Sequence, residues 1–378
     1  VALSIARQGV IGDAYQIGQG PTAHLMPLNP LLAGGVMWLL GSGSTAANLT
    51  LLALSLGQVV CGYLLVRLVF VRLGADPRAV RWGTALLMLL APFVPQETVD
   101  FRYWEGASAL CLVALNMLAM IALDERRRLS RRELLYIPFL FALTAFVSPP
   151  AGLAVAVGWA VVALRALPFA SAAALAGATA LALAALFVPW TLRNASVLGE
   201  PIPLRSNFGI ELALAMHPAA VSGEQPEQVF HDRLGEVHPA ANAAALAFVH
   251  RDGEAAYSRE LARRSWAWIR ANPVASARLW LRHVGEVFVP HPWQMYFTGW
   301  EGARTLRATT IGLVQLIGLI GLVIALRTRR RYWIVASYLA VTALAFGFFQ
   351  PMPRYGFLIY PFFAFLAAQA IVSLRRRA

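Results

Sequence analysis

Residues 308–326 read Ala-Thr-Thr-Ile-Gly-Leu-Val-Gln-Leu-Ile-Gly-Leu-Ile-Gly-Leu-Val-Ile-Ala-Leu and contain no charged side chain. Lipid offers the backbone no hydrogen-bond partners, so an apolar stretch of roughly 17 to 25 residues predicts a helix that crosses a bilayer. Arg327 and arginines 329–331 follow directly. Because arginines concentrate in the cytoplasmic loops of membrane proteins, this stretch predicts both a membrane-spanning helix and its direction.

The composition of the whole chain agrees with that prediction. Hydrophobic residues make up 58% of the 378 positions, charged residues 13%, and the mean hydropathy is +0.60. These values are too apolar for a water-soluble domain of this length. The net charge of +13 comes entirely from arginines, which occur in short runs between apolar stretches and form no continuous basic groove. Nucleic acid is therefore not a predicted partner, whereas membrane lipids are.

The chain is predicted to be an all-α polytopic membrane protein. Nine stretches are apolar enough to be membrane crossings, namely residues 45–73, 82–96, 106–123, 133–148, 150–167, 169–190, 308–326, 332–349 and 355–374. Residues 28–40 are too short to span and are predicted to form an interfacial helix. Cys61 and Cys111 fall within apolar stretches, where small buried hydrophobes are expected and a disulfide or metal site is not.

The arginines give these crossings an orientation. If the chain begins outside, the inner loops contain sixteen arginines, namely Arg72, Arg78, Arg81, arginines 126–128, Arg131, Arg132, Arg165, Arg327, arginines 329–331 and arginines 375–377. The short outer loops contain only Arg102 and Arg354. The distribution predicts a multi-pass membrane protein with these loops in the cytoplasm, and we expect it in the bacterial inner membrane. The chain starts at Val1 without an initiator methionine or signal-like stretch, so we expect a further spanning helix upstream.

This topology divides the chain into four parts. Residues 1–44 form a periplasmic first loop with interfacial helices, 45–190 six transmembrane helices, 191–307 a periplasmic helical segment, and 308–378 three transmembrane helices with a basic cytoplasmic tail. Within the third part, apolar spacing predicts one helix over residues 254–271 and another from Pro273 to about Phe288. The aromatic residues between Pro290 and Trp300 are typical of a chain returning to the headgroup layer.

The sequence has none of the familiar motifs of soluble enzymes. It lacks a dinucleotide-binding fingerprint, a phosphate-binding loop, a Gly-x-Ser-x-Gly motif and a His-Glu-x-x-His motif. His231 and His238 are seven residues apart in a polar stretch, but no clear third metal ligand accompanies them. No cofactor is predicted, and a divalent-metal requirement is left open.

Polar residues on the outer side are the candidates for chemistry. Asp13 and His24 lie just before the interfacial helix, and Arg354 lies at the mouth of the last crossing. The stretch 97–105 places three carboxylates and an arginine in one short turn, namely Glu97, Asp100, Arg102 and Glu105. The planar guanidinium of arginine suits a phosphate because it can bind two oxygens. Solvated loops, topological anchors and structural ion pairs are the alternative interpretations.

Four stretches of the sequence resemble the bacterial GT-C glycosyltransferases of the protein-mannosyltransferase and lipid A aminoarabinose-transferase type. They extend over nearly the whole chain, and comprise residues 2–7 with 20–24 and 27–33, Trp104-Glu105, Pro189-Trp190-Thr191-Leu192-Arg193-Asn194 with residues 203–209, and Pro353-Arg354-Tyr355. The resemblance implies a GT-C-type transmembrane helix bundle. It further implies inverting transfer of a sugar from a polyprenyl-phosphate donor to a lipid, glycan or protein acceptor.

In this family an outer-loop carboxylate acts as the base and basic groups hold the lipid phosphate, roles that suit the acceptor proton and the departing phosphate. Because the family's usual acid would lie upstream of Val1, Asp13 and Glu105 are the candidates within this chain for the catalytic carboxylate. The resemblance implies that the remaining candidates bind substrate, namely His24, Glu97, Asp100, Arg102, Arg193, Arg205, Asn207, Arg354 and Tyr355.

The chain departs from the family pattern at two points. Asn29 stands where relatives often have tyrosine, and the usual acidic residue would lie upstream of Val1. Two other functions are compatible with the composition. A transporter or flippase of lipid-linked glycans would bind the same ligand without bond chemistry, although the sequence shows no internal repeat. A non-catalytic membrane scaffold would have no organised cluster of acids and arginines.

Overall fold

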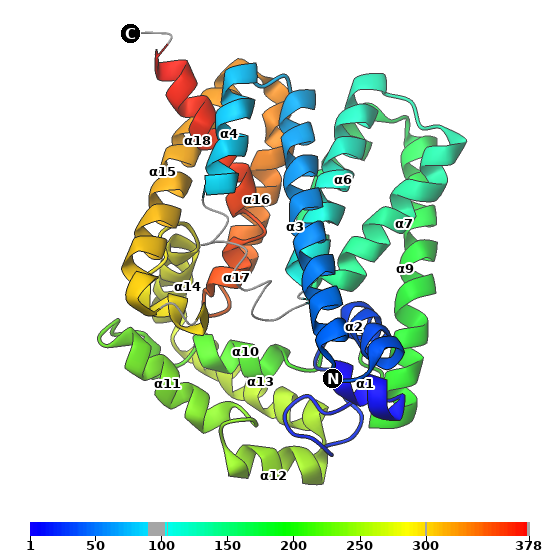
Figure 1. Ribbon diagram of the computed structural model, residues 1–378, viewed down its shortest axis with the longest axis vertical. Coiled ribbons are helices and arrows are strands. Elements are labelled where there is room, and N and C mark those ends of the chain that lie inside the picture. Colours follow the sequence, from blue (N-terminus) through cyan, green and yellow to red (C-terminus); the bar gives the residue numbers. More distant parts are fainter. Residues whose placement is uncertain (90–102, 104, 299–300, 376–378) are drawn as a thin grey trace. The chain divides into compact units, whose positions relative to one another are not determined.

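The computed structural model describes residues 1–89, 103, 105–298 and 301–375 of the chain (Figure 1). Within these residues it is helical throughout, with no strand and one isolated antiparallel bridge between Gly12 and Pro21. Five of the described helices are long and apolar enough to cross a membrane, namely α3 (Thr45–Arg72), α6 (Glu105–Arg126), α8 (Pro149–Ala166), α9 (Phe169–Leu198) and α15 (Arg304–Thr328). The prediction of an all-helical chain with membrane-length apolar helices is confirmed at this level.

The other four predicted crossings form shorter helices. They are α4 (Pro77–Leu89), α7 (Arg131–Val147), α16 (Trp333–Phe346) and the pair α17 (Pro353–Gly356) and α18 (Tyr360–Arg375). Residues 90–96 of the predicted second crossing lie outside the described residues. Pro361, expected inside a helix, occupies the first turn of α18, where its missing N–H costs no hydrogen bond. The last predicted crossing is therefore two helices with a turn between them.

The chain divides into two compact units, which we describe separately. Unit 1 contains Val1–Leu51, Phe187–Gly285 and Ala345–Pro351, and unit 2 contains Leu52–Leu186, Glu286–Leu344 and Met352–Ala378. The predicted first loop and most of the predicted periplasmic segment thus belong to one unit. Residues 286–307 of that segment belong to the other.

Close helix packing at glycines forms the centre of unit 2. A Cβ on Gly318 would lie 2.7 Å from the ring of Phe363, and one on Gly321 would lie 1.9 Å from the carbonyl oxygen of Leu366. Since both pairs advance by three residues, α15 and α18 run parallel where they touch. On the other side of α18, Phe365 stacks on Phe70 of α3 with ring centroids 5.0 Å apart.

A buried polar network joins three further helices of unit 2. The amide nitrogen of Asn116 in α6 donates to the hydroxyl of Thr144 in α7 at 2.9 Å and to the carbonyl of Leu112 at 2.8 Å. Its amide oxygen accepts the indole N–H of Trp159 in α8 at 2.8 Å. All hydrogens of this amide are therefore used inside the protein, as apolar surroundings require.

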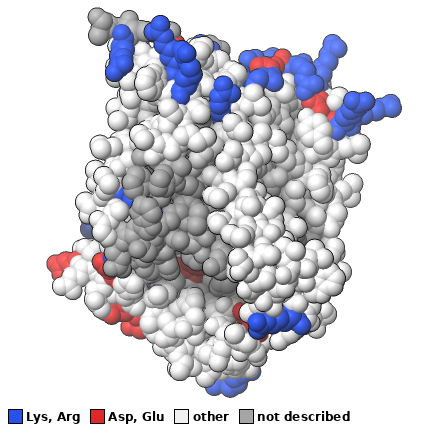
Figure 2. Space-filling model, in the orientation of Figure 1, with Lys and Arg blue, Asp and Glu red and all other residues white. Residues whose placement is uncertain are grey.

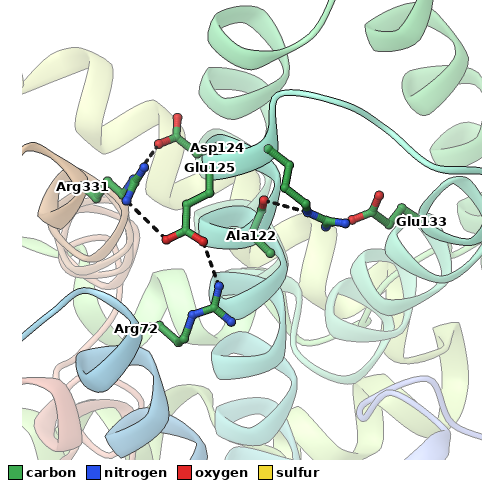
Figure 3. A network of polar contacts seen from close by, with 7 residues as sticks. Arg72, Ala122, Asp124, Glu125, Glu133 and Arg331 are labelled. Atoms are coloured by element: carbon green, nitrogen blue, oxygen red, sulfur yellow. Dashed lines mark hydrogen bonds and ion pairs between the residues drawn. The ribbon is translucent and has the colours of Figure 1, made fainter.

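The arginines predicted to be cytoplasmic are exposed, apart from Arg330, Arg376 and Arg377, whose side chains lie outside the described part of the chain. Basic side chains gather at one end of unit 2, which we call the basic end (Figure 2). Figure 3 shows ion pairs that join the loops there. Glu125 accepts from Arg72 at 2.8 Å and from Arg331 at 3.2 Å, and Arg331 also reaches Asp124 at 3.2 Å. Arg126 pairs with Glu133, the residue that completes the capping box of α7 with Ser130. The ends of α3, α6 and α7 and the segment after α15 therefore meet at the basic end.

Unit 1 is built around the short helix α10 (Phe208–Ala215). Buried side chains of α10 pack against α11 (Pro226–Val237), α12 (Ala243–Asp252) and α13 (Glu254–Ala271). Gly209 allows the closest approach, because its amide donates to the Ser258 hydroxyl at 2.9 Å and a Cβ would collide with the Ser258 carbonyl. The predicted helices over 254–271 and from Pro273 are confirmed as α13 and α14 (Pro273–Phe288).

The N-terminal part of unit 1 contains two helices and the loop between them. Helix α1 (Ala2–Gln8) packs on α2 (Leu28–Leu40), where Gly34 meets the side chain of Ile5. The predicted helix over residues 28–40 is confirmed as α2. Residues 9–27 connect α1 to α2 within the longer loop predicted over residues 1–44, and contain the candidate residues Asp13 and His24. From here on, the term first loop means residues 9–27 only.

Candidate functional site

The first loop is held by a buried carboxylate from α13. Glu254, whose side chain is 4% exposed, accepts a 2.6 Å hydrogen bond from the Thr22 hydroxyl and a 2.5 Å hydrogen bond from the Ala23 amide. Glu254 is the first residue of α13, where unpaired N–H groups and the helix dipole favour a negative charge. The sequence analysis did not select this residue, although its two oxygens organise the loop.

Arg193, near the end of α9, holds the same loop by donating hydrogen bonds to its backbone carbonyl groups. Its guanidinium donates to the Thr22 carbonyl at 2.8 Å and to the Ile11 carbonyl at 2.7 Å. The guanidinium also lies over the ring of Trp190, 5.3 Å from the ring centroid. The peptide group around Thr22 is therefore held between the Glu254 carboxylate and the Arg193 guanidinium, and we call this arrangement the loop clamp.

The stretch around Arg193 also holds the segment that precedes α10. The Trp190 indole donates to the carbonyl of Leu204 at 3.1 Å, and the Asn194 amide donates to the carbonyl of Ile202 at 2.7 Å. The Ser206 amide then donates to the Ala23 carbonyl at 3.0 Å. Residues 20–24, 189–194 and 203–209, far apart in sequence, are thus joined by direct hydrogen bonds.

Asp13 closes the first loop on itself. Its φ of 61° is in the left-handed region, which aspartate tolerates because its short polar side chain can bond locally. The Asp13 carboxylate accepts the Gly20 amide at 3.0 Å, and the Asp13 amide donates to the Gly20 carbonyl at 2.9 Å. The carboxylate is half-buried and is thus more accessible than that of Glu254.

His24 belongs to a group of rings within unit 1. Its Nδ1 and the Tyr15 hydroxyl form a 3.1 Å hydrogen bond, and the Tyr15 ring meets the rings of His24 and His238 edge-on at centroid distances of 5.0 and 5.6 Å. Burial, with the nearby carboxylates of Glu254 and Glu211, raises the pKa of Tyr15, so its hydroxyl keeps its proton. Burial lowers the pKa of His238, which favours the neutral ring.

Five of the predicted site residues therefore lie in unit 1, namely Asp13, His24, Arg193, Arg205 and Asn207. Arg205 is half-buried in the segment tied to the first loop by Ser206. The Asn207 amide donates to Glu211 at 3.3 Å. These residues come from the first loop, the end of α9 and the approach to α10.

The remaining candidates lie elsewhere. Glu105 is the first residue of α6 and Tyr355 lies in α17, both in unit 2. The backbone of Arg354 is part of α17. Glu97, Asp100 and Arg102 are outside the described residues.

The metal-ligating residues of the described part of the chain form no cluster. Among those residues, no three His, Cys, Asp or Glu side chains come together as metal ligands. His231 lies in α11 and His238 directly follows that helix, and the ring partner of His238 is Tyr15.

Comparison of the chain with models of protein families, with curated proteins and with solved structures found no match.

Proposed function

We propose that this protein is a membrane glycosyltransferase of the GT-C type, which moves a sugar from a polyprenyl-phosphate donor to a lipid, glycan or protein acceptor. The observation that supports the proposal most strongly is the loop clamp with its neighbouring segment. Three stretches that resemble the family, residues 20–24, 189–194 and 203–209, are joined by hydrogen bonds in unit 1. A common site would require this proximity.

Asp13 is the better base candidate among the acids of the first-loop region. Both oxygens of Glu254 already accept short hydrogen bonds in a buried position, whereas the Asp13 carboxylate is half-buried with one oxygen on Gly20. A general base must reach the acceptor hydroxyl directly. Glu105 at the start of α6 is the second base candidate.

Arginine is the natural group to hold the donor phosphate, because its five N–H donors can bind two phosphate oxygens at once. Arg193 donates to two loop carbonyls and, together with Arg205 and Arg354, is a candidate for holding this phosphate. The departing phosphate gains negative charge during transfer, and a nearby guanidinium stabilises that charge.

We further propose that the protein is a multi-pass component of the bacterial inner membrane, with the basic end of unit 2 in the cytoplasm. The support is the exposure of its arginines, which the positive-inside tendency assigns to cytoplasmic loops (Figure 2). The crossings predicted from the sequence would put the first loop and α10–α13 in the periplasm.

The test is transfer from a labelled polyprenyl-phosphate sugar in proteoliposomes. We expect wild-type protein to release sugar to an acceptor. We expect Asp13→Asn to reduce turnover by at least 100-fold, within the range of general-base catalysis, and Arg354→Ala to abolish transfer with normal membrane insertion. Asp232→Asn, an exposed substitution in α11, is the control. Translocation of the labelled lipid without sugar release would favour the flippase, and wild-type turnover in Arg354→Ala would refute the phosphate role of Arg354.

A further inference from the structure

A second feature of unit 1 lies along α13, the helix that begins with Glu254 of the loop clamp. An open hollow of about 740 Å³ is lined by Arg259, Arg263, Arg264 and Glu260, with Phe248 and Ala256 among its apolar walls. The three arginines are highly exposed, at 62%, 71% and 67% of their side-chain surface. Arg259 and Arg263 are four residues apart and lie on one face of the helix, and Glu260 joins Arg263 to Arg264.

The ion pairs of the hollow leave positive charge in excess. Glu260 accepts two hydrogen bonds from Arg263, at 2.9 and 2.7 Å, and one from Arg264 at 2.7 Å. Hydrogen bonds from these two arginines lower the pKa of Glu260 to about 2, so its carboxylate is ionised at neutral pH. Arg259 forms a further ion pair with Glu200, so the three arginines face two carboxylates and keep a formal excess of one positive charge.

The arginines also keep donors for a ligand. A guanidinium has five N–H groups, and Arg263 uses two of its nitrogens and Arg264 one on Glu260. These side chains are held by the shared carboxylate, which lowers the conformational freedom that binding would have to remove. The geometry is therefore suited to an anion with several acceptor oxygens.

We propose that this hollow, which we call the α13 hollow, binds the phosphate group of a ligand. A phosphate group brings at least one negative charge against the excess of the lining, and a phosphate monoester has more acceptor oxygens than a carboxylate. The apolar walls at Phe248 and Ala256 suit a hydrocarbon part beside that phosphate. The bound phosphate belongs either to a phospholipid headgroup or to a soluble compound, and this inference does not depend on the transferase proposal.

The experiment measures binding to the full chain in neutral detergent, without any transfer reaction. One arm titrates inorganic phosphate by calorimetry, and the other measures phosphatidylglycerol retained in mixed micelles by native mass spectrometry. The test variant is Arg263→Gln with Arg264→Gln. The matched control is Arg270→Gln with Arg278→Gln, which removes the same charge from exposed positions outside the hollow.

We expect the test variant to lose at least tenfold in affinity for the probe that binds, and the control to stay within twofold of wild type. Binding of phosphatidylglycerol alone would assign the phosphate to a lipid, and binding of inorganic phosphate would assign it to a soluble ligand. The proposal is overturned if neither probe binds the wild type, or if both double variants weaken binding equally. Thermal unfolding of each variant verifies that it is folded.

Discussion

Replacing Glu254 with alanine provides the most direct test of the loop clamp. The substitution removes a buried carboxylate that accepts from the Thr22 hydroxyl and the Ala23 amide. A hydrogen bond to a charged group contributes about 1.5–3 kcal/mol, and an unpaired buried partner adds a desolvation cost. Water that enters the opened loop forms hydrogen bonds in place of some of those that are lost. We therefore expect the free energy of local opening of the first loop to fall by about 3 kcal/mol.

That free energy can be measured by amide hydrogen exchange of residues 9–27. The Asp13 amide donates to the Gly20 carbonyl and the Thr22 amide to the Ile11 carbonyl, so both report opening. Since 1.36 kcal/mol corresponds to a factor of ten, exchange in Glu254→Ala should be about 150-fold faster. Glu254→Gln, which keeps an acceptor, should give a smaller acceleration.

The control for this experiment is Glu236→Gln, because the Glu236 side chain is 64% exposed and forms only a surface ion pair with Arg233. We expect its exchange rates in the first loop to equal those of the wild type. If Glu254→Ala exchanges no faster than Glu236→Gln, the buried carboxylate does not hold the loop and the reasoning is refuted.

Two further predictions concern packing and acid stability. Gly321→Ala should lower the thermal midpoint in detergent, because its Cβ would lie 1.9 Å from the Leu366 carbonyl oxygen and overpacking costs about 1–3 kcal/mol. The control Gly177→Ala should not lower the midpoint, because a Cβ on Gly177 has nothing within 4 Å. Equal midpoints of the two variants would contradict the parallel contact between α15 and α18. Burial lowers the pKa values of His217 and His283 to about 4, so the unfolded chain binds more protons and stability should fall as the pH drops from about 6.5 to 4. In His283→Gln, the thermal midpoint should fall less steeply between about pH 6.5 and 4 than in the wild type. An unchanged dependence of the midpoint on pH would contradict the role of His283.

The long apolar helices, together with α13 and α14, were predictable because local patterns determine them, whereas α10, α11 and α12 were not predicted individually. The spacing of apolar residues and the proline after Asn272 indicated where α13 and α14 begin and end. The capping residue Ser130, together with Glu133, explains why α7 begins at Arg131. The length of the last crossing was not predictable from hydropathy. An apolar composition does not reveal that the chain turns after Gly356 before α18 starts.

The candidate site was predictable only in part, for a physical reason. Resemblance directed attention to His24 and Arg193, but the partners of Arg193 are backbone carbonyls, which have no sequence signature. Glu254 and Thr22 are 232 residues apart, and no local spacing connects them. A glutamate at the start of a helix is common for electrostatic reasons alone, so its role in the loop clamp required the fold.

The Asn116 network has a consequence for how the α6–α8 helices can move. Sliding any one of them by a single turn displaces its polar group by about 5.4 Å, far beyond hydrogen-bond reach. In hydrocarbon there is no water to compensate the separated amide, hydroxyl and indole. These three helices should therefore tilt or shift as one rigid body, and any conformational change in this part of unit 2 must bend elsewhere.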